Sequence, residues 1–76
     1  MDDARARLLG CFSAVFPDVP PGRLAAVSTE TLAAWDSVAT VTLVAVIEEE
    51  FGVSFHPEDY GRLASFEECL HCLETR

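Results

Sequence analysis

The sequence contains no lysine, and its five basic residues are all arginines. Thirteen aspartates and glutamates outweigh them, so the formal net charge is −8 at pH 7. Nucleic-acid binding depends on phosphate neutralisation by clustered lysine and arginine, and this composition argues against a nucleic-acid partner. A strongly acidic surface instead favours encounter with the basic surfaces of other proteins.

Long apolar runs are also missing. No stretch approaches the ~20 consecutive apolar residues of a membrane span, and residues 1–5 contain no apolar signal core. We therefore expect a soluble, cytoplasmic protein that does not bind a membrane.

Cysteine is scarce and odd in number, with Cys11, Cys69 and Cys72. In a chain without a secretion signal this argues against a disulfide framework. Cys69 and Cys72 form a C-x-x-C with His71 between them, but in a helix His71 points to a different face, and a structural zinc needs four ligands. We expect no metal site. Cys11 and Cys69 are expected to be buried thiols, and Cys72 to be more reactive.

The apolar content is sufficient for one small core. Half of the 76 residues are hydrophobic, and a chain of this length buries only about 60% of its unfolded surface. Residues 1–76 are therefore interpreted as a single domain, which we expect to be monomeric.

Two helices are predicted near the ends of the chain. In residues 2–16 helical spacing relates Leu8, Cys11, Phe12 and Val15, and Pro17 ends the helix. Gly10 weakens this helix by about 1 kcal/mol relative to alanine, and we interpret it as room for a neighbouring helix. The last helix begins at Ser65, whose pairing with Glu68 predicts a capping box. Its expected core residues are Phe66, Cys69, Leu70 and Leu73.

The connections between helices differ in length. Residues 17–35 lack sustained periodicity and are predicted to be a long loop, anchored by Leu24, Val27, Leu32 and Trp35. Trp35 is either a partly buried anchor that holds the following turn or also a contact for a partner or a cofactor. Residues 53–62 are predicted to contain one short helical turn around 58–60, with Phe55 in the core.

The helix predicted at residues 37–51 has two apolar stripes. Asp36 is a favoured N-cap residue, which places Ser37 in the first turn, at the positive end of the helix dipole. At 100° per residue one stripe consists of Leu43, Val44, Ile47 and Phe51, and the other of Val38, Val41 and Ala45. The first stripe is predicted to be core. The second stripe could be buried too, but one stripe suffices for a helix that faces the core, and Glu48 and Glu49 flank the second. We therefore interpret these five residues as a partner-binding surface.

These elements predict an all-α fold: a small up-down four-helix bundle of three longer helices and one short helix, with a long first loop. The first helix is expected to run antiparallel to the second.

The motif residues Asp36-Ser37-Val38, then Leu43-Val44, then Glu48-Glu49-Glu50-Phe51-Gly52, resemble the acyl carrier protein family. The resemblance also covers the chain length and the order of elements. It implies that Ser37 is the attachment point of 4′-phosphopantetheine and that Asp36 is recognised by the phosphopantetheinyl transferase. Carriers of fatty acid synthesis commonly have acids two and five positions after the serine, where this chain has Ala39 and Thr42. This departure argues against docking to a standard fatty acid synthase. The Trp35-Asp36-Ser37 form looks more like small discrete carriers of specialised biosynthesis, including polyketide, nonribosomal-peptide and amino-acid pathways.

The function that the resemblance implies is a freestanding carrier that holds an acyl or aminoacyl group as a thioester and catalyses nothing itself. Its partners would be the transferase, a loading ligase or acyltransferase, and downstream synthase enzymes with basic docking patches. The alternative is a carrier-like fold that serves only as a protein-interaction module, with Ser37 unmodified. An enzyme with Ser37 as nucleophile is not expected, because the sequence has no G-x-S-x-G setting and nothing orients His56 as a base.

Overall fold

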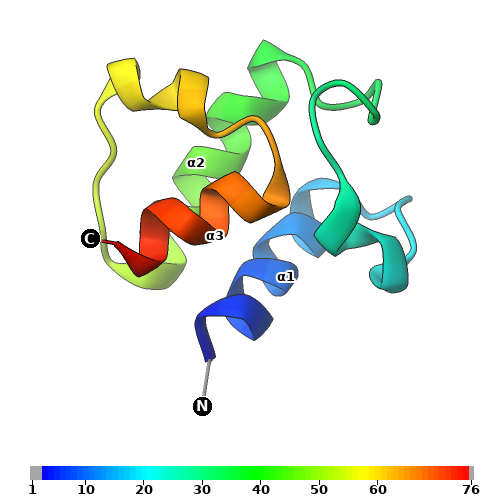
Figure 1. The fold of residues 1–76 in the computed structure, drawn as a ribbon, viewed down its shortest axis with the longest axis horizontal. Helices are drawn as coiled ribbons and strands as arrows, with labels where there is room; N and C mark the ends of the chain where they lie inside the picture. Colours follow the sequence, from blue (N-terminus) through cyan, green and yellow to red (C-terminus); the bar gives the residue numbers. More distant parts are fainter. Residues whose placement is uncertain (1–2, 76) are drawn as a thin grey trace.

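The computed structural model describes residues 3–75 (Figure 1). Asp2, where the first helix was expected to begin, lies outside them. The described residues form three α-helices and two 3₁₀ helices and contain no strand, so the predicted all-α class is confirmed. The elements in chain order are α1 (Asp3–Val15), η1 (Pro21–Ala26), α2 (Ser37–Phe51), η2 (Pro57–Arg62) and α3 (Phe66–Glu74). Within residues 3–75 no helix is long and apolar enough to cross a bilayer.

Helices α1 and α2 run antiparallel, as expected. Arg7, in the first half of α1, forms a 2.9 Å ion pair with Glu50 at the end of α2. At the opposite end, Trp35 precedes α2 and contacts the ring of Phe16, which follows α1, at 5.7 Å between centroids. Contacts at both ends therefore fix the direction of each helix.

The first connection is more ordered than predicted. It contains the 3₁₀ helix η1, and the segment after η1 pairs with the residues that precede α3. Thr29 N–H donates to the carbonyl of Ala64 at 2.8 Å, and Phe66 N–H donates to the carbonyl of Val27 at 3.1 Å. These bonds attach the first connection to the end of the second connection and to the start of α3.

The core lies between the helices and is closed by aromatic rings. Phe12 packs edge-on against Trp35 at 5.4 Å and against Phe66 at 5.0 Å. The buried residues also include the following: Leu8, Cys11, Phe16, Leu24, Val27, Leu43, Val44, Ile47, Phe55, Leu63, Cys69 and Leu70. Each edge-to-face aromatic pair contributes about 0.5–1.5 kcal/mol beyond its area burial, so these rings hold α1, α3 and the start of α2 together.

Both caps of α2 and the cap of α3 follow from local sequence. Gly52 ends α2 in the left-handed region, at φ 65°, and its N–H donates to the carbonyl of Glu48. Glycine adopts this conformation without a Cβ penalty. Ser65 accepts a 3.1 Å hydrogen bond from the N–H of Glu68, which is the predicted N-cap of α3.

Candidate functional site

Ser37 is the first residue of α2, and it is exposed. The preceding Asp36 is the N-cap in extended conformation, and its carboxylate accepts a 2.8 Å hydrogen bond from the N–H of Ala39. The first N–H groups of an α-helix have no intrahelical acceptor and form the positive end of the dipole. The hydroxyl of Ser37 thus lies at a place that favours an attached phosphate.

A chain of hydrogen bonds fixes the turn before Ser37 from the inside. The indole Nε1–H of Trp35 donates to the hydroxyl of Thr40 at 2.9 Å, and that hydroxyl donates to the carbonyl of Asp36 at 3.1 Å. Thr40 N–H also donates to the carbonyl of Asp36, at 2.9 Å. Asp36 and Ser37 are therefore held by groups on both sides of them in sequence.

Trp35 is a buried anchor, and this decides between the two sequence-based interpretations. Trp35 is only 3% exposed, and its indole ring contacts the rings of Phe12 and Phe16. Too little of it reaches the surface for a partner contact. Its role is to join the site to the core.

The two stripes of α2 separate as predicted. Leu43, Val44 and Ile47 are buried, and Phe51 is half-buried. On the other side Val38 is 73% exposed, Val41 is 55% exposed, and Ala45 is exposed. Val38 and Val41 are the large hydrophobic residues that the described part of the chain leaves exposed, and they begin directly after Ser37.

The acidic end of α2 differs from the expectation. Glu48, predicted to flank the exposed stripe, is half-buried, and its carboxylate accepts a 2.7 Å hydrogen bond from the N–H of Phe55. Glu50 is paired with Arg7. Glu49 is exposed and forms no ion pair with a residue between 3 and 75. Only Glu49 therefore fits the predicted role of a free acid beside the stripe.

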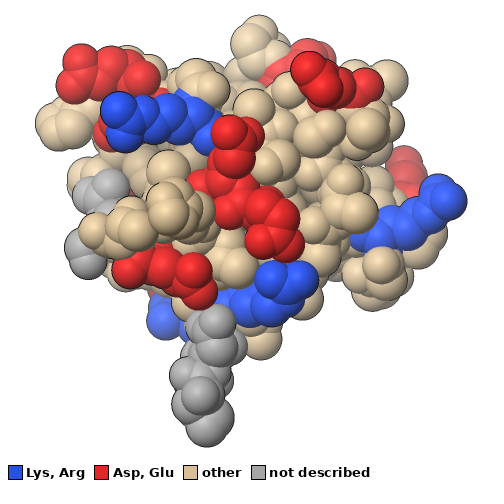
Figure 2. Space-filling model, viewed as in Figure 1, with Lys and Arg blue, Asp and Glu red and all other residues tan. Residues whose placement is uncertain are grey.

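Acidic side chains are prominent on the surface (Figure 2). They run across the middle of the face on which α3 lies, and arginines lie nearer its margin. Glu67, in the first turn of α3, is 3.5 Å from the guanidinium of Arg5. The negative electrostatic potential of these acidic side chains attracts basic protein surfaces.

The cysteines are placed as predicted. Cys11 and Cys69 are buried and Cys72 is half-buried; all three are free thiols. Burial, with smaller contributions from Cys72 and Glu68, raises the pKa of Cys69 to about 12. Burial also raises the pKa of Cys11. Residues 3–75 contain no group of three or more histidine, cysteine or acidic side chains that could hold a metal ion.

Thr40 is a site residue that sequence reasoning missed. Its hydroxyl links the Trp35 indole to the Asp36 carbonyl. A threonine four residues after an N-cap is a usable signal, because its hydroxyl can reach the i−4 carbonyl. Its bond to the indole had no sequence signature, since the ring orientation depends on packing against α1.

No family model, curated protein or solved structure matches the chain.

Proposed function

We propose that the chain is a carrier protein that holds an acyl or aminoacyl group on a 4′-phosphopantetheine arm attached to Ser37. The observation that carries this proposal is the exposed hydroxyl at the first position of α2 on a turn fixed by Asp36, Trp35 and Thr40. A modifying enzyme needs an accessible hydroxyl that is presented in one orientation. The motif resemblance to acyl carrier proteins points to the same residue.

The residues around Ser37 fit the group that the proposal requires. The attached phosphodiester would lie at the positive end of α2, where negative charge is stabilised by about 0.3–1 kcal/mol. The arm, when attached, supplies a thiol that carries the cargo as a thioester. The protein itself supplies position and a docking surface. Within residues 3–75 no histidine or carboxylate is hydrogen-bonded to the Ser37 hydroxyl, which suits a serine that is modified by another protein.

The proposed partners are a phosphopantetheinyl transferase that recognises Asp36, a loading ligase or acyltransferase, and downstream synthase enzymes. These would contact the exposed stripe of Val38, Val41 and Ala45 through an apolar groove, with a basic group opposite Glu49. The first turn of α2 contains no acidic residue, which favours partners of specialised biosynthesis over a standard fatty acid synthase. The proposal implies the up-down bundle of the carrier family, a monomer and a cytoplasmic location.

The test is modification by coenzyme A and a broad-specificity phosphopantetheinyl transferase, followed by intact-protein mass spectrometry. The parent protein is expected to gain one arm and Ser37→Ala none. Ser13→Ala, which removes an exposed serine from α1, is the matched control and is expected to be modified like the parent. Modification of Ser37→Ala, or none of the parent, would reject the carrier function. If the parent protein is not modified, the alternative is a protein-interaction module in which Ser37 carries no arm.

A further inference from the structure

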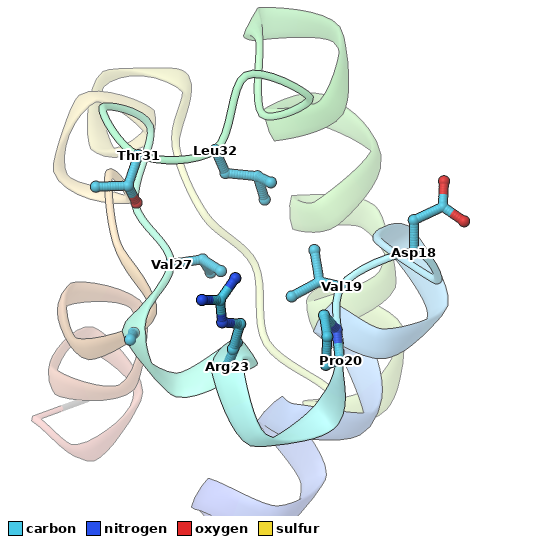
Figure 3. Close-up of a pocket in the computed structure, with 8 residues that line it drawn as sticks. Asp18, Val19, Pro20, Arg23, Val27, Thr31 and Leu32 are labelled. Atoms are coloured by element: carbon cyan, nitrogen blue, oxygen red, sulfur yellow. The ribbon is translucent and has the colours of Figure 1, made fainter.

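A hollow of about 460 Å³, open to solvent, lies beneath the first connection (Figure 3). It is lined by Asp18, Val19, Pro20, Arg23, Ala26, Val27, Thr31 and Leu32. This volume falls within the ~300–1,000 Å³ that is typical of small-molecule sites. None of the hollow's residues belongs to the proposed attachment site.

The walls of the hollow are mainly apolar. Val27 is buried, and Val19 and Leu32 are half-buried and pack against the core. The hydroxyl of Thr31 is already engaged by the backbone N–H and the hydroxyl of Ser28, each at 3.1 Å. These surfaces suit the hydrocarbon part of a ligand.

Arg23 supplies the charged group of the hollow. Its guanidinium extends into the space between Val27 and Val19, whereas the carboxylate of Asp18 points away (Figure 3). No residue between 3 and 75 forms a hydrogen bond or ion pair with this guanidinium. A guanidinium is always charged and matches a carboxylate with two parallel hydrogen bonds. Arg23 is thus an unpaired cation beside apolar walls in a strongly acidic protein.

We propose that this hollow binds a carboxylate carried on a short apolar chain. Arg23 holds the carboxylate, and Val19, Val27 and Leu32 contact the chain. A single arginine fits one carboxylate. A phosphate carries more charge and more acceptor oxygens, and Arg23 is the single basic residue among those that line the hollow, next to the acidic Asp18.

The position of the hollow suggests one source of this ligand. Leu32 is five residues before Ser37, and five extended residues span at most about 18 Å. The bond from Trp35 N–H to the carbonyl of Leu32, at 3.0 Å, shortens that span further. One source is a cargo that is tethered at Ser37 and ends in a free carboxylate. This version of the proposal rests on the proposed function. A free carboxylic acid is the other, and its binding does not depend on that function.

The first experiment titrates ¹⁵N-labelled, unmodified protein with monomethyl glutarate and follows ¹H–¹⁵N NMR spectra. We expect saturable shifts centred on Val19, Val27, Thr31 and Leu32. Arg23→Gln should weaken binding about tenfold or more, since hydrogen bonds to charged groups contribute ~1.5–3 kcal/mol. Arg62→Gln, which removes an exposed arginine from the last turn of η2, should leave binding unchanged. Absence of saturable shifts, equal binding by Arg23→Gln, or equal binding of neutral dimethyl glutarate would overturn the proposal.

The second experiment distinguishes the two sources. Protein carrying a glutaryl group on the arm is compared with protein carrying a pentanoyl group, which has the same length but no carboxylate. If the NMR signals of the hollow's residues shift in the glutaryl protein but not in the pentanoyl protein, the cargo is the ligand. Binding of the free acid without such shifts assigns the hollow to a free acid. If Ser37 accepts no arm, the proposed function fails, but the titration still tests the hollow.

Discussion

The indole N–H of Trp35 and the hydroxyl of Thr40 lie 2.9 Å apart, on either side of Ser37 in the sequence. The ring of Trp35 belongs to the core, and Thr40 belongs to the first turns of α2. Their bond couples the orientation of the exposed serine to the packing of α1. A change at Thr40 therefore tests whether the core sets the geometry of the site.

Thr40→Val keeps the shape of the side chain but removes the hydroxyl. The indole loses its acceptor and the carbonyl of Asp36 loses one donor, which is expected to lower the free energy of unfolding by about 1–3 kcal/mol. Thr40→Ser, which keeps the hydroxyl, is the control. Urea unfolding followed by the fluorescence of Trp35, the one tryptophan, measures the difference. Equal stability of the valine and serine variants would contradict the role of this bond.

Cys69 predicts a loss of stability at alkaline pH. Its ordinary pKa is 9.0, and burial raises the pKa to about 12 in the folded protein. Between these values the unfolded chain binds fewer protons than the folded one, so the free energy of unfolding falls as pH rises, by at most about 1.4 kcal/mol per pH unit. Denaturant unfolding between pH 8 and 11 measures the slope. Cys69→Ala should show a smaller slope, and an identical slope would rule out this thiol as the cause.

The periodic and local features of the fold were predictable from sequence. The stripes of α2 follow from 3.6 residues per turn, which places Ile47 in the core and Val41 outside it. The caps at Asp36 and Ser65 each depend on residues three positions apart. Such features need no knowledge of the neighbouring chain, and for that reason the position of Ser37 at the start of α2 could be predicted.

Features that depend on contacts distant in sequence could not be predicted. The bond from Phe55 to Glu48 requires the chain after Gly52 to turn back toward α2. The hollow around Arg23 is lined by residues 18–32, which the folding of the first connection brings together. Neither arrangement leaves a periodic or capping signal, so the sequence alone predicts Glu48 to be a surface acid and assigns no role to Arg23.

Gly10 was interpreted as room for a neighbouring helix, and the structure contradicts this. A Cβ built on Gly10 meets no atom within 4 Å outside the immediate helix. Gly10→Ala is therefore expected to stabilise the protein by about 0.5–1 kcal/mol, because alanine restricts the unfolded chain and favours the helix. Thermal unfolding measured by circular dichroism should show a higher Tm. An unchanged or lower Tm would indicate a contact or a helix distortion at this position.

Glu48 and Glu49 are adjacent but are expected to respond differently to substitution. Glu48→Ala removes the charged acceptor of the Phe55 N–H bond, whose distance is 2.7 Å, and should cost about 1.5–3 kcal/mol of stability. Glu49→Ala, at an exposed position, should change stability by no more than ~0.5 kcal/mol. Urea unfolding of both variants makes the comparison. Equal losses would mean that the Glu48 bond does not stabilise the end of α2.

The exposed stripe of α2 predicts that one aspartate substitution slows transfer of the arm to Ser37 and that another unfolds the protein. Val41→Asp, at 55% exposure, should retain the helical circular dichroism signal. Ile47→Asp, at a position that is fully buried, should cost about 4 kcal/mol or more by placing an unpaired charge in the core. A domain this small has roughly 3–5 kcal/mol to lose. Ile47→Asp is therefore expected to unfold.

The effect of Val41→Asp on transfer of the arm to Ser37 needs a control for its added charge. Thr42→Asp places the same charge at the next exposed position of α2, four residues after Val38, and leaves the apolar residues Val38, Val41 and Ala45 in place. If apolar contact holds a partner against this face, Val41→Asp should slow transfer of the arm to Ser37 much more than Thr42→Asp does. Equal slowing would mean that repulsion of the charge accounts for the effect. Unchanged rates for both variants would mean that the transferase does not use this face of α2, because it would then respond neither to the loss of an apolar contact nor to the added charge.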